Sequence, residues 1–113
     1  MPVALRRVLQ TLAVLALAAL VLWPRPALAL PDGAELFENH CAGCHVHGGN
    51  IIRRGKTLKL AALERQGLAS PEAIAQVAAA GIGQMGGYAS VLGEGGPEAV
   101  AAWVWQQAQD GWA

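Results

Sequence analysis

The sequence predicts a small all-α domain of about four helices that follows a short apolar leader. Signals that start and stop helices recur along the second part of the chain, and no stretch alternates apolar and polar residues as a β-strand does. The leader covers residues 1–29 and the domain covers residues 30–113. A domain of that length is near the lower limit for a self-sufficient apolar core, so something should supplement the core.

The leader has the pattern of a secretory signal peptide. Arg6 and Arg7 form a positive region, residues 8–23 are mostly apolar, and Ala27-Leu28-Ala29 is a small-x-small cleavage signal. We predict export and cleavage after Ala29. The alternative is an uncleaved membrane anchor, but crossing a bilayer takes about 20 apolar residues. This run has sixteen positions, two of them polar.

Two helices of the domain are predicted from their capping residues. Asp32 is a candidate cap with Glu35 three positions later, and the helix should run into Cys41. Ser70 is followed by Pro71 and an acidic residue, which is a strong start signal, and this helix should end near Gly81.

Two further helices are predicted from their boundaries and periodicity. Thr57 opens a helix over residues 58–66, which Gly67 stops. The last helix starts at Gly96-Pro97 and ends at about Gln109. Its apolar face consists of Val100, Trp103, Val104 and Ala108.

The first helix leads into the most informative motif of the chain, Cys41-Ala42-Gly43-Cys44-His45. A C-x-x-C-H run is the attachment site of c-type haem. Two thiols three residues apart lie on one helical turn, where each can add to a vinyl group of the haem. The adjacent His45 is then delivered to one axial face of the iron. A covalently bound haem would also supply the apolar surface that this small core lacks.

Three other uses of the two cysteines are weaker. A Cys41–Cys44 disulfide would close a very small loop and leave His45 unexplained. A zinc site built from both cysteines and two histidines lacks the usual long spacer between ligand pairs. A thioredoxin-like dithiol should sit in a βαβ context, which the sequence does not predict.

The second axial ligand is predicted to be Met85, the only methionine of residues 30–113. Met85 lies in a glycine-rich stretch some forty residues after His45, and methionine opposite histidine raises the haem potential. A lone methionine is more often core filler. His40 and His47 are rivals for the iron, but the cysteines tie both to the proximal side, so we expect surface imidazoles.

Charge is unevenly distributed in residues 30–113. This part of the chain has eight acidic and five basic residues, and all five basic residues lie within positions 53–65. Such a cluster is either a solvated face or a device that steers the protein toward an acidic docking patch. The domain is acidic and exported, and its basic residues do not alternate with aromatic ones. We therefore expect no nucleic-acid partner.

These pieces occur in an order that resembles a known family. After the pentapeptide come Gly48-Gly49-Asn50, Lys56-Thr57-Leu58, Met85 and Ala101-Ala102-Trp103-Val104. Over nearly all of residues 31–113 the chain resembles cytochrome c6, the small class I carrier of oxygenic phototrophs. The resemblance implies an all-helical cytochrome c fold whose first and last helices cross, with one covalently bound haem c. It implies thioether bonds at Cys41 and Cys44 and axial ligation by His45 and Met85.

Two departures from the family pattern favour a cytochrome c6-like variant branch. Pro-Ala-aromatic usually follows the methionine, whereas Gly86-Gly87-Tyr88 follows Met85, which predicts a looser and more easily displaced ligand loop. Val77 stands eight residues before the methionine, where the family typically has a glutamine near the haem. Loss of a polar side chain there should change the haem potential.

The predicted function is one-electron transfer by a soluble, monomeric carrier that is not an enzyme. The resemblance implies redox partners, with electrons arriving from cytochrome f of the cytochrome b6f complex and leaving to photosystem I or an oxidase. It also implies a thylakoid lumen or periplasmic location. The alternative is a haem sensor or weak peroxidase, with an open sixth position if Met85 does not bind the iron. Against it, the stretch around Met85 offers only Gln84 and Tyr88 as polar side chains.

Overall fold

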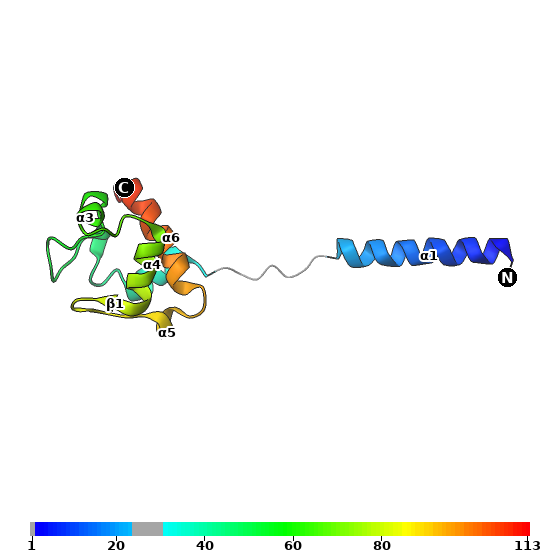
Figure 1. Ribbon diagram of the computed structural model, residues 1–113, viewed down its shortest axis with the longest axis horizontal. Coiled ribbons are helices and arrows are strands. Elements are labelled where there is room, and N and C mark those ends of the chain that lie inside the picture. Colours follow the sequence, from blue (N-terminus) through cyan, green and yellow to red (C-terminus); the bar gives the residue numbers. More distant parts are fainter. Residues whose placement is uncertain (1, 24–30) are drawn as a thin grey trace.

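The computed structural model describes residues 2–23 and 31–113, which form the predicted helical architecture (Figure 1). The leader contains α1 (Val3–Leu22). The domain contains α2 (Gly33–His40), η1, a short 3₁₀ helix (Val46–Gly48), α3 (Leu60–Arg65), α4 (Pro71–Ala80), β1 (Gly81–Ile82), β2 (Met85–Gly86), α5 (Ala89–Leu92) and α6 (Gly96–Gln109).

Helix α1 is longer than the apolar run on which the leader prediction was based. It has 20 residues, because it begins before Arg6 and includes both arginines. None of these residues is buried. Its length and composition would allow it to cross a bilayer, and a signal sequence near an N-terminus passes the same test. Length alone therefore does not separate a signal peptide from an anchor. The predicted cleavage site at residues 27–29 lies outside the described residues.

The capping residues predicted from the sequence begin α2 and α4. The Asp32 carboxylate accepts hydrogen bonds from the backbone N–H groups of Ala34 and Glu35, at 3.0 and 3.3 Å. The Ser70 hydroxyl accepts one from the N–H of Ala73 at 3.1 Å. Each cap satisfies N–H groups that the first turn of a helix leaves without a partner. Helix α2 ends at His40, so the C-x-x-C-H motif starts at a helix end, as predicted.

Helix α3 begins later than predicted, at Leu60 rather than Leu58. The reason is that both backbone groups of Leu58 bind distant partners. Its N–H donates to the carbonyl of Gly48 at 2.7 Å, and its carbonyl accepts from the indole N–H of Trp112 at 3.0 Å. These long-range bonds hold Leu58 outside the helix and join it to the segment after the haem motif.

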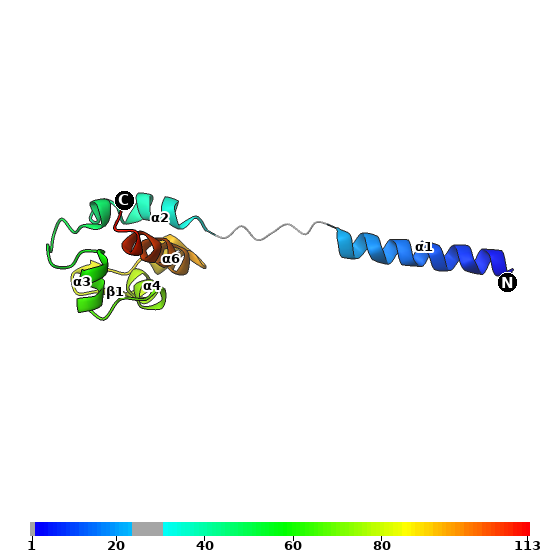
Figure 2. The same ribbon diagram turned by 90° about the horizontal axis from the view of Figure 1, so that it is seen from above.

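The first and last helices of the domain, α2 and α6, pack directly on each other (Figure 2). The approach is close at Gly33, where an added Cβ would lie 2.9 Å from the Cβ of Trp103. Helix α4 also packs on α6. The core between these helices contains Phe37, Leu63, Ile74, Ala78, Leu92, Val100, Ala101, Val104 and Ala108. Three of the four residues predicted for the apolar face of α6 are buried, and Trp103 is half-buried.

The short elements η1, β1, β2 and α5 were not predicted. The strands β1 and β2 form an antiparallel hairpin in the glycine-rich stretch, and α5 follows it. Strands of two residues and a helix of four are too short to leave a periodic pattern. The hairpin matters for the site because it carries Met85.

Candidate haem-binding site

The predicted site residues lie around one apolar cavity of about 430 Å³. Cys41, Cys44 and His45 contribute from the segment that follows α2, and Met85 contributes from the hairpin. The cavity volume is within the roughly 300–1,000 Å³ that is typical of ligand sites. Most of its remaining wall is apolar: Phe37, Leu58, Leu63, Leu68, Ile74, Val77, Ala78, Val100 and Val104.

The two cysteines lie at the edge of this cavity and are not joined by a disulfide. Cys41 is half-buried and Cys44 is exposed. The turn that joins them is closed by a hydrogen bond from the N–H of Cys44 to the carbonyl of Cys41, at 3.2 Å. Burial raises the pKa of the Cys41 thiol, and the negative charge that Cys44 can carry raises this pKa further. Before haem attachment, the Cys41 thiol is therefore harder to deprotonate than an ordinary cysteine.

The imidazole of His45 is oriented by a backbone carbonyl. Its Nδ1 lies 2.7 Å from the carbonyl oxygen of Gly49. Because a carbonyl can only accept a hydrogen bond, Nδ1 carries the proton and Nε2 keeps its lone pair. Nε2 is thus the nitrogen available to a metal. The sequence predicted no particular acceptor for Nδ1, since any nearby residue has a backbone carbonyl to offer.

Met85 is half-buried and its position is fixed by the hairpin. It pairs with Ile82 across the ladder, and Gly81 pairs with Gly86. Two glycines allow the close packing of this hairpin. Gly81 has φ +82°, and a Cβ at Gly87 would lie 2.9 Å from the carbonyl carbon of Ala80. The loop lacks the family's proline, and strand pairing and glycine packing hold it instead.

The two rival histidines differ in position. His47 is exposed, as expected, and lies in a second groove beside Trp103 and Trp112. His40 is half-buried and lines the haem cavity, so its imidazole is less exposed than that of His47. The last turn of α2 faces the cavity, which brings His40 to its wall. Within residues 2–23 and 31–113, no three His, Cys, Asp or Glu side chains are grouped closely enough to hold a metal ion.

The loop between η1 and α3 forms one rim of the cavity. Asn50 organises this loop: its side-chain oxygen accepts from the N–H groups of Ile52 and Arg53, at 2.9 and 2.8 Å. The Nε of Arg53 donates to the side-chain oxygen of Gln84 at 3.4 Å, so the loop touches the Met85 hairpin across the cavity mouth. This contact was not predicted, because Arg53 precedes Gln84 by 31 residues in the sequence.

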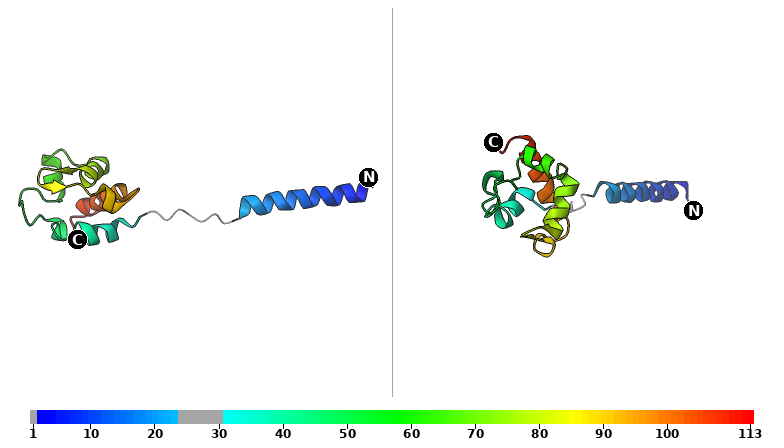
Figure 3. Two further views of the ribbon diagram at one scale, coloured as in Figure 1. Left: turned by 90° about the horizontal axis from the view of Figure 1, so that it is seen from below. Right: turned by 60° about the vertical axis from the view of Figure 1, so that its left-hand side comes forward.

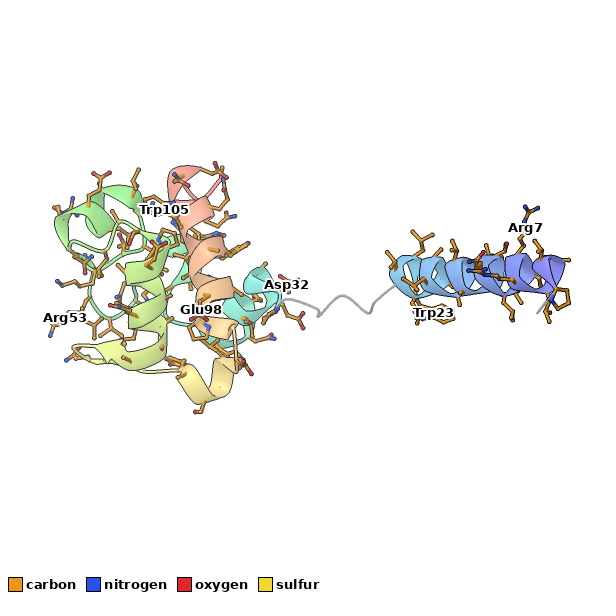
Figure 4. All side chains as sticks on the ribbon, turned by 45° about the vertical axis from the view of Figure 1, so that its right-hand side comes forward. Arg7, Trp23, Asp32, Arg53, Glu98 and Trp105 are labelled. Atoms are coloured by element: carbon orange, nitrogen blue, oxygen red, sulfur yellow. The ribbon has the colours of Figure 1, made fainter. Side chains whose placement is uncertain are left out.

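Charge around the cavity is polarised as the sequence predicted. All five basic residues are exposed, and Arg53 and Lys56 line the cavity mouth. Arg53 and Asp32 lie on opposite sides of the domain (Figure 4). Two exposed isoleucines, Ile52 and Ile82, also border the mouth. The cavity therefore opens on a face that is both apolar and basic.

Comparisons with known proteins agree with this arrangement. Residues 28–104 match the family described as cytochrome C oxidase, cbb3-type, subunit III. The chain is 44% identical over 81 residues to a cytochrome c6-like protein of Nostoc sp., covering 72% of this chain and 73% of the relative. It is 38% identical to cytochrome c6 of Synechococcus sp., covering 95% of this chain and 98% of the relative.

Solved structures give the same result. Cytochrome c6B from Synechococcus sp. WH8102 is 64% identical with a TM-score of 0.73, covering 75% of this chain and 97% of the other. Cytochrome c6C from Synechococcus sp. PCC 7002 is 49% identical with a TM-score of 0.68, covering 71% and 98%. These variant names agree with the predicted variant branch.

One covalently bound haem c is the cofactor of this family, and the residues present fit it. Two free thiols, an imidazole with an available Nε2 and a thioether all border the same apolar cavity. The chain belongs to the cytochrome c6 family of electron carriers.

Proposed function

We propose that this chain is a soluble one-electron carrier in which Cys41 and Cys44 hold the haem by thioether bonds and His45 and Met85 are its axial ligands. The observation that carries the proposal is that these four residues border one apolar cavity although Met85 lies forty residues after His45. The haem, when bound, supplies the one-electron ferric and ferrous couple.

The residues of the chain have separate tasks in this proposal. The Gly49 carbonyl holds His45 in one orientation and increases the basicity of its Nε2. The thioether of Met85 favours the reduced state and so raises the potential. The apolar wall, including Leu63 and Val100, excludes water. No proton transfer or bond change at a protein residue is required, and the proposed role is therefore not enzymatic.

We propose export as well, with residues 1–29 removed as a signal peptide and residues 30–113 working in a thylakoid lumen or periplasm. The apolar helix α1, its two arginines and the haem attachment motif support this proposal, since thiols acquire haem outside the cytoplasm. Intact mass of the purified protein tests it. The expected mass is that of residues 30–113 with one haem. A full-length chain in the membrane fraction would contradict the proposed cleavage.

The proposed partners are redox proteins with an acidic patch. By family resemblance the donor is cytochrome f and the acceptor is photosystem I or an oxidase, with the chain acting as a monomer. Exposed Arg53 and Lys56 at the cavity mouth support docking of an acidic surface there, and exposed Ile52 supplies an apolar contact.

Absorption spectra test the central proposal. The chain is expressed with its leader in a host competent for haem attachment, and spectra are recorded in both oxidation states. A low-spin spectrum with covalently retained haem, and the weak red band of ferric iron bound by methionine sulfur, is expected. A high-spin resting spectrum with rapid carbon monoxide uptake would instead favour the haem sensor or weak peroxidase. Absence of covalent haem would contradict both.

A further inference from the structure

The C-terminal end of the chain returns to the segment that follows the haem motif (Figure 3). Trp112 makes the contact. A Cβ added at the buried Gly48 would lie 2.6 Å from the indole Nε1 of Trp112, so the indole ring covers the Gly48 backbone directly. The same Nε1–H donates a hydrogen bond to the carbonyl of Leu58 at 3.0 Å. One side chain thus holds two segments that are ten residues apart.

The two segments held by Trp112 are also bonded to each other. The N–H of Leu58 donates to the carbonyl of Gly48 at 2.7 Å. Trp112, Gly48 and Leu58 therefore form a closed set in which the indole fixes both ends of the loop that forms the cavity rim. A side chain at position 48 would separate them, and Gly48 has φ +76°, which glycine adopts without strain.

One turn connects Gly48 to the proposed haem ligand His45. The N–H of Gly48 donates to the carbonyl of His45 at 3.0 Å, and the N–H of Gly49 donates to the carbonyl of Val46 at 2.8 Å. The carbonyl of Gly49 then accepts the hydrogen bond of His45 Nδ1 at 2.7 Å. Trp112 covers Gly48, and Gly48 directly precedes Gly49, whose carbonyl orients the imidazole. A shift of Gly48 therefore moves that carbonyl.

The backbone at the end of α6 is bent to deliver this indole. Gly111 has φ +73° and Trp112 has φ +60°, which is costly for a residue with a bulky side chain. Phe37 and Trp103 hold the ring by tilted and edge contacts, with centroids 5.5 and 5.7 Å from that of Trp112. Simple core filling would not require a positive φ together with an indole hydrogen bond.

From this geometry we infer that Trp112 is a positioning residue for the axial imidazole: it fixes the Gly48–Gly49 turn and thereby the hydrogen bond from His45 Nδ1 to the Gly49 carbonyl. The inference rests on the proposed function, because it takes His45 as an iron ligand. A strong hydrogen bond at Nδ1 makes the imidazole a better donor to ferric iron and lowers the haem potential. Weakening this bond raises the potential.

The test compares Trp112→Phe with the wild-type haem protein. Phenylalanine keeps an aromatic ring but removes the N–H donor to Leu58. In the reduced state, NMR measures solvent exchange of the His45 Nδ1–H and of the Leu58 amide. About tenfold faster exchange at both sites is expected for the loss of one hydrogen bond. The midpoint potential should rise while the spectrum stays low-spin. Trp112→Leu, which also removes the ring, should shift both readings further.

Trp105→Phe is the matched control. Trp105 is half-buried on α6 and packs against the core, but it does not line the haem cavity. Thermal unfolding of both variants reports the general loss of packing. Trp105→Phe should leave the potential and the His45 exchange rate unchanged even if stability falls.

Three results would overturn the inference. The first is a Trp112→Phe variant whose His45 and Leu58 exchange rates and midpoint potential equal those of the wild type. The second is an equal change in Trp112→Phe and Trp105→Phe, which would reflect loosening of the whole domain. The third is faster exchange at Leu58 with no change at His45, which would confine the effect of Trp112 to the loop. A wild-type protein without low-spin covalent haem is a different failure, since it contradicts the proposed function itself.

Discussion

Met85 pairs with Ile82 in the antiparallel ladder of β1 and β2, so the predicted second axial ligand is carried by a hairpin. The hairpin is anchored at its far end, where the N–H of Tyr88 donates to the carbonyl of Ala78 at 2.9 Å. Strand pairing thus fixes a segment whose sequence, with glycine at positions 83, 86 and 87, has few intrinsic constraints.

Replacing the thioether tests the ligand assignment. Met85→Ala should lose the weak red band of ferric iron bound by sulfur, become high-spin and acquire carbon monoxide or cyanide binding, because no other side chain is proposed for this axial position. The midpoint potential should fall. Absorption spectroscopy and ligand titration measure these changes. Retention of the low-spin spectrum and red band in Met85→Ala would show that another residue is the ligand.

Adjacent glycines test whether hairpin packing keeps Met85 in place. Gly87→Ala puts a Cβ 2.9 Å from the carbonyl carbon of Ala80, whereas a Cβ at Gly86 meets nothing within 4 Å. Gly87→Ala should displace the hairpin from α4 and increase exogenous ligand binding to the ferric protein by about tenfold, the equivalent of about 1.4 kcal/mol. Cyanide titration measures it. Gly86→Ala is the control and should bind cyanide as the wild type does; equal effects in both variants would refute the steric explanation.

A second pair of glycines separates backbone strain from crowding beneath Trp112. Gly48 and Gly67 have similar positive φ values, +76° and +70°, but only Gly48 lies under the indole. Gly67→Ala should lower the free energy of unfolding by about 1–2 kcal/mol through strain alone. Gly48→Ala should cost a further 1–3 kcal/mol or so, because the indole must shift. Denaturant unfolding of the haem protein measures both, and equal losses would contradict the contact.

Charge reversal tests the docking face. The double variant Arg53→Glu with Arg54→Glu should slow reduction by an acidic redox partner at low salt, and the difference should shrink as salt rises. Stopped-flow kinetics across ionic strengths measure it. The matched control is Lys59→Glu with Arg65→Glu, which makes the same charge change at two exposed positions away from the cavity, whereas Arg53 lines its mouth. Equal slowing in the two double variants would indicate net charge rather than a docking site, and unchanged low-salt rates would exclude steering.

Where the fold depends on neighbours in sequence, the prediction was correct. Asp32 and Ser70 begin α2 and α4 because a capping side chain bonds N–H groups two or three residues away. The start of α3 was predicted two residues too early, because Leu58 looks like a helix residue but bonds to Gly48 and Trp112. Local propensity was overridden there by tertiary contacts.

For the site, residue identity alone was enough to predict the chemistry: two thiols and an imidazole in one pentapeptide, and one methionine downstream as the proposed ligand of the opposite face. How these groups are held depends on contacts between distant segments. The Gly49 carbonyl orients His45, Trp112 covers Gly48, and a hairpin carries Met85. Each side chain's chemistry follows directly from its residue type. Backbone carbonyls and amides are nearly the same at every position, so their long-range partners are known only once distant segments pack together.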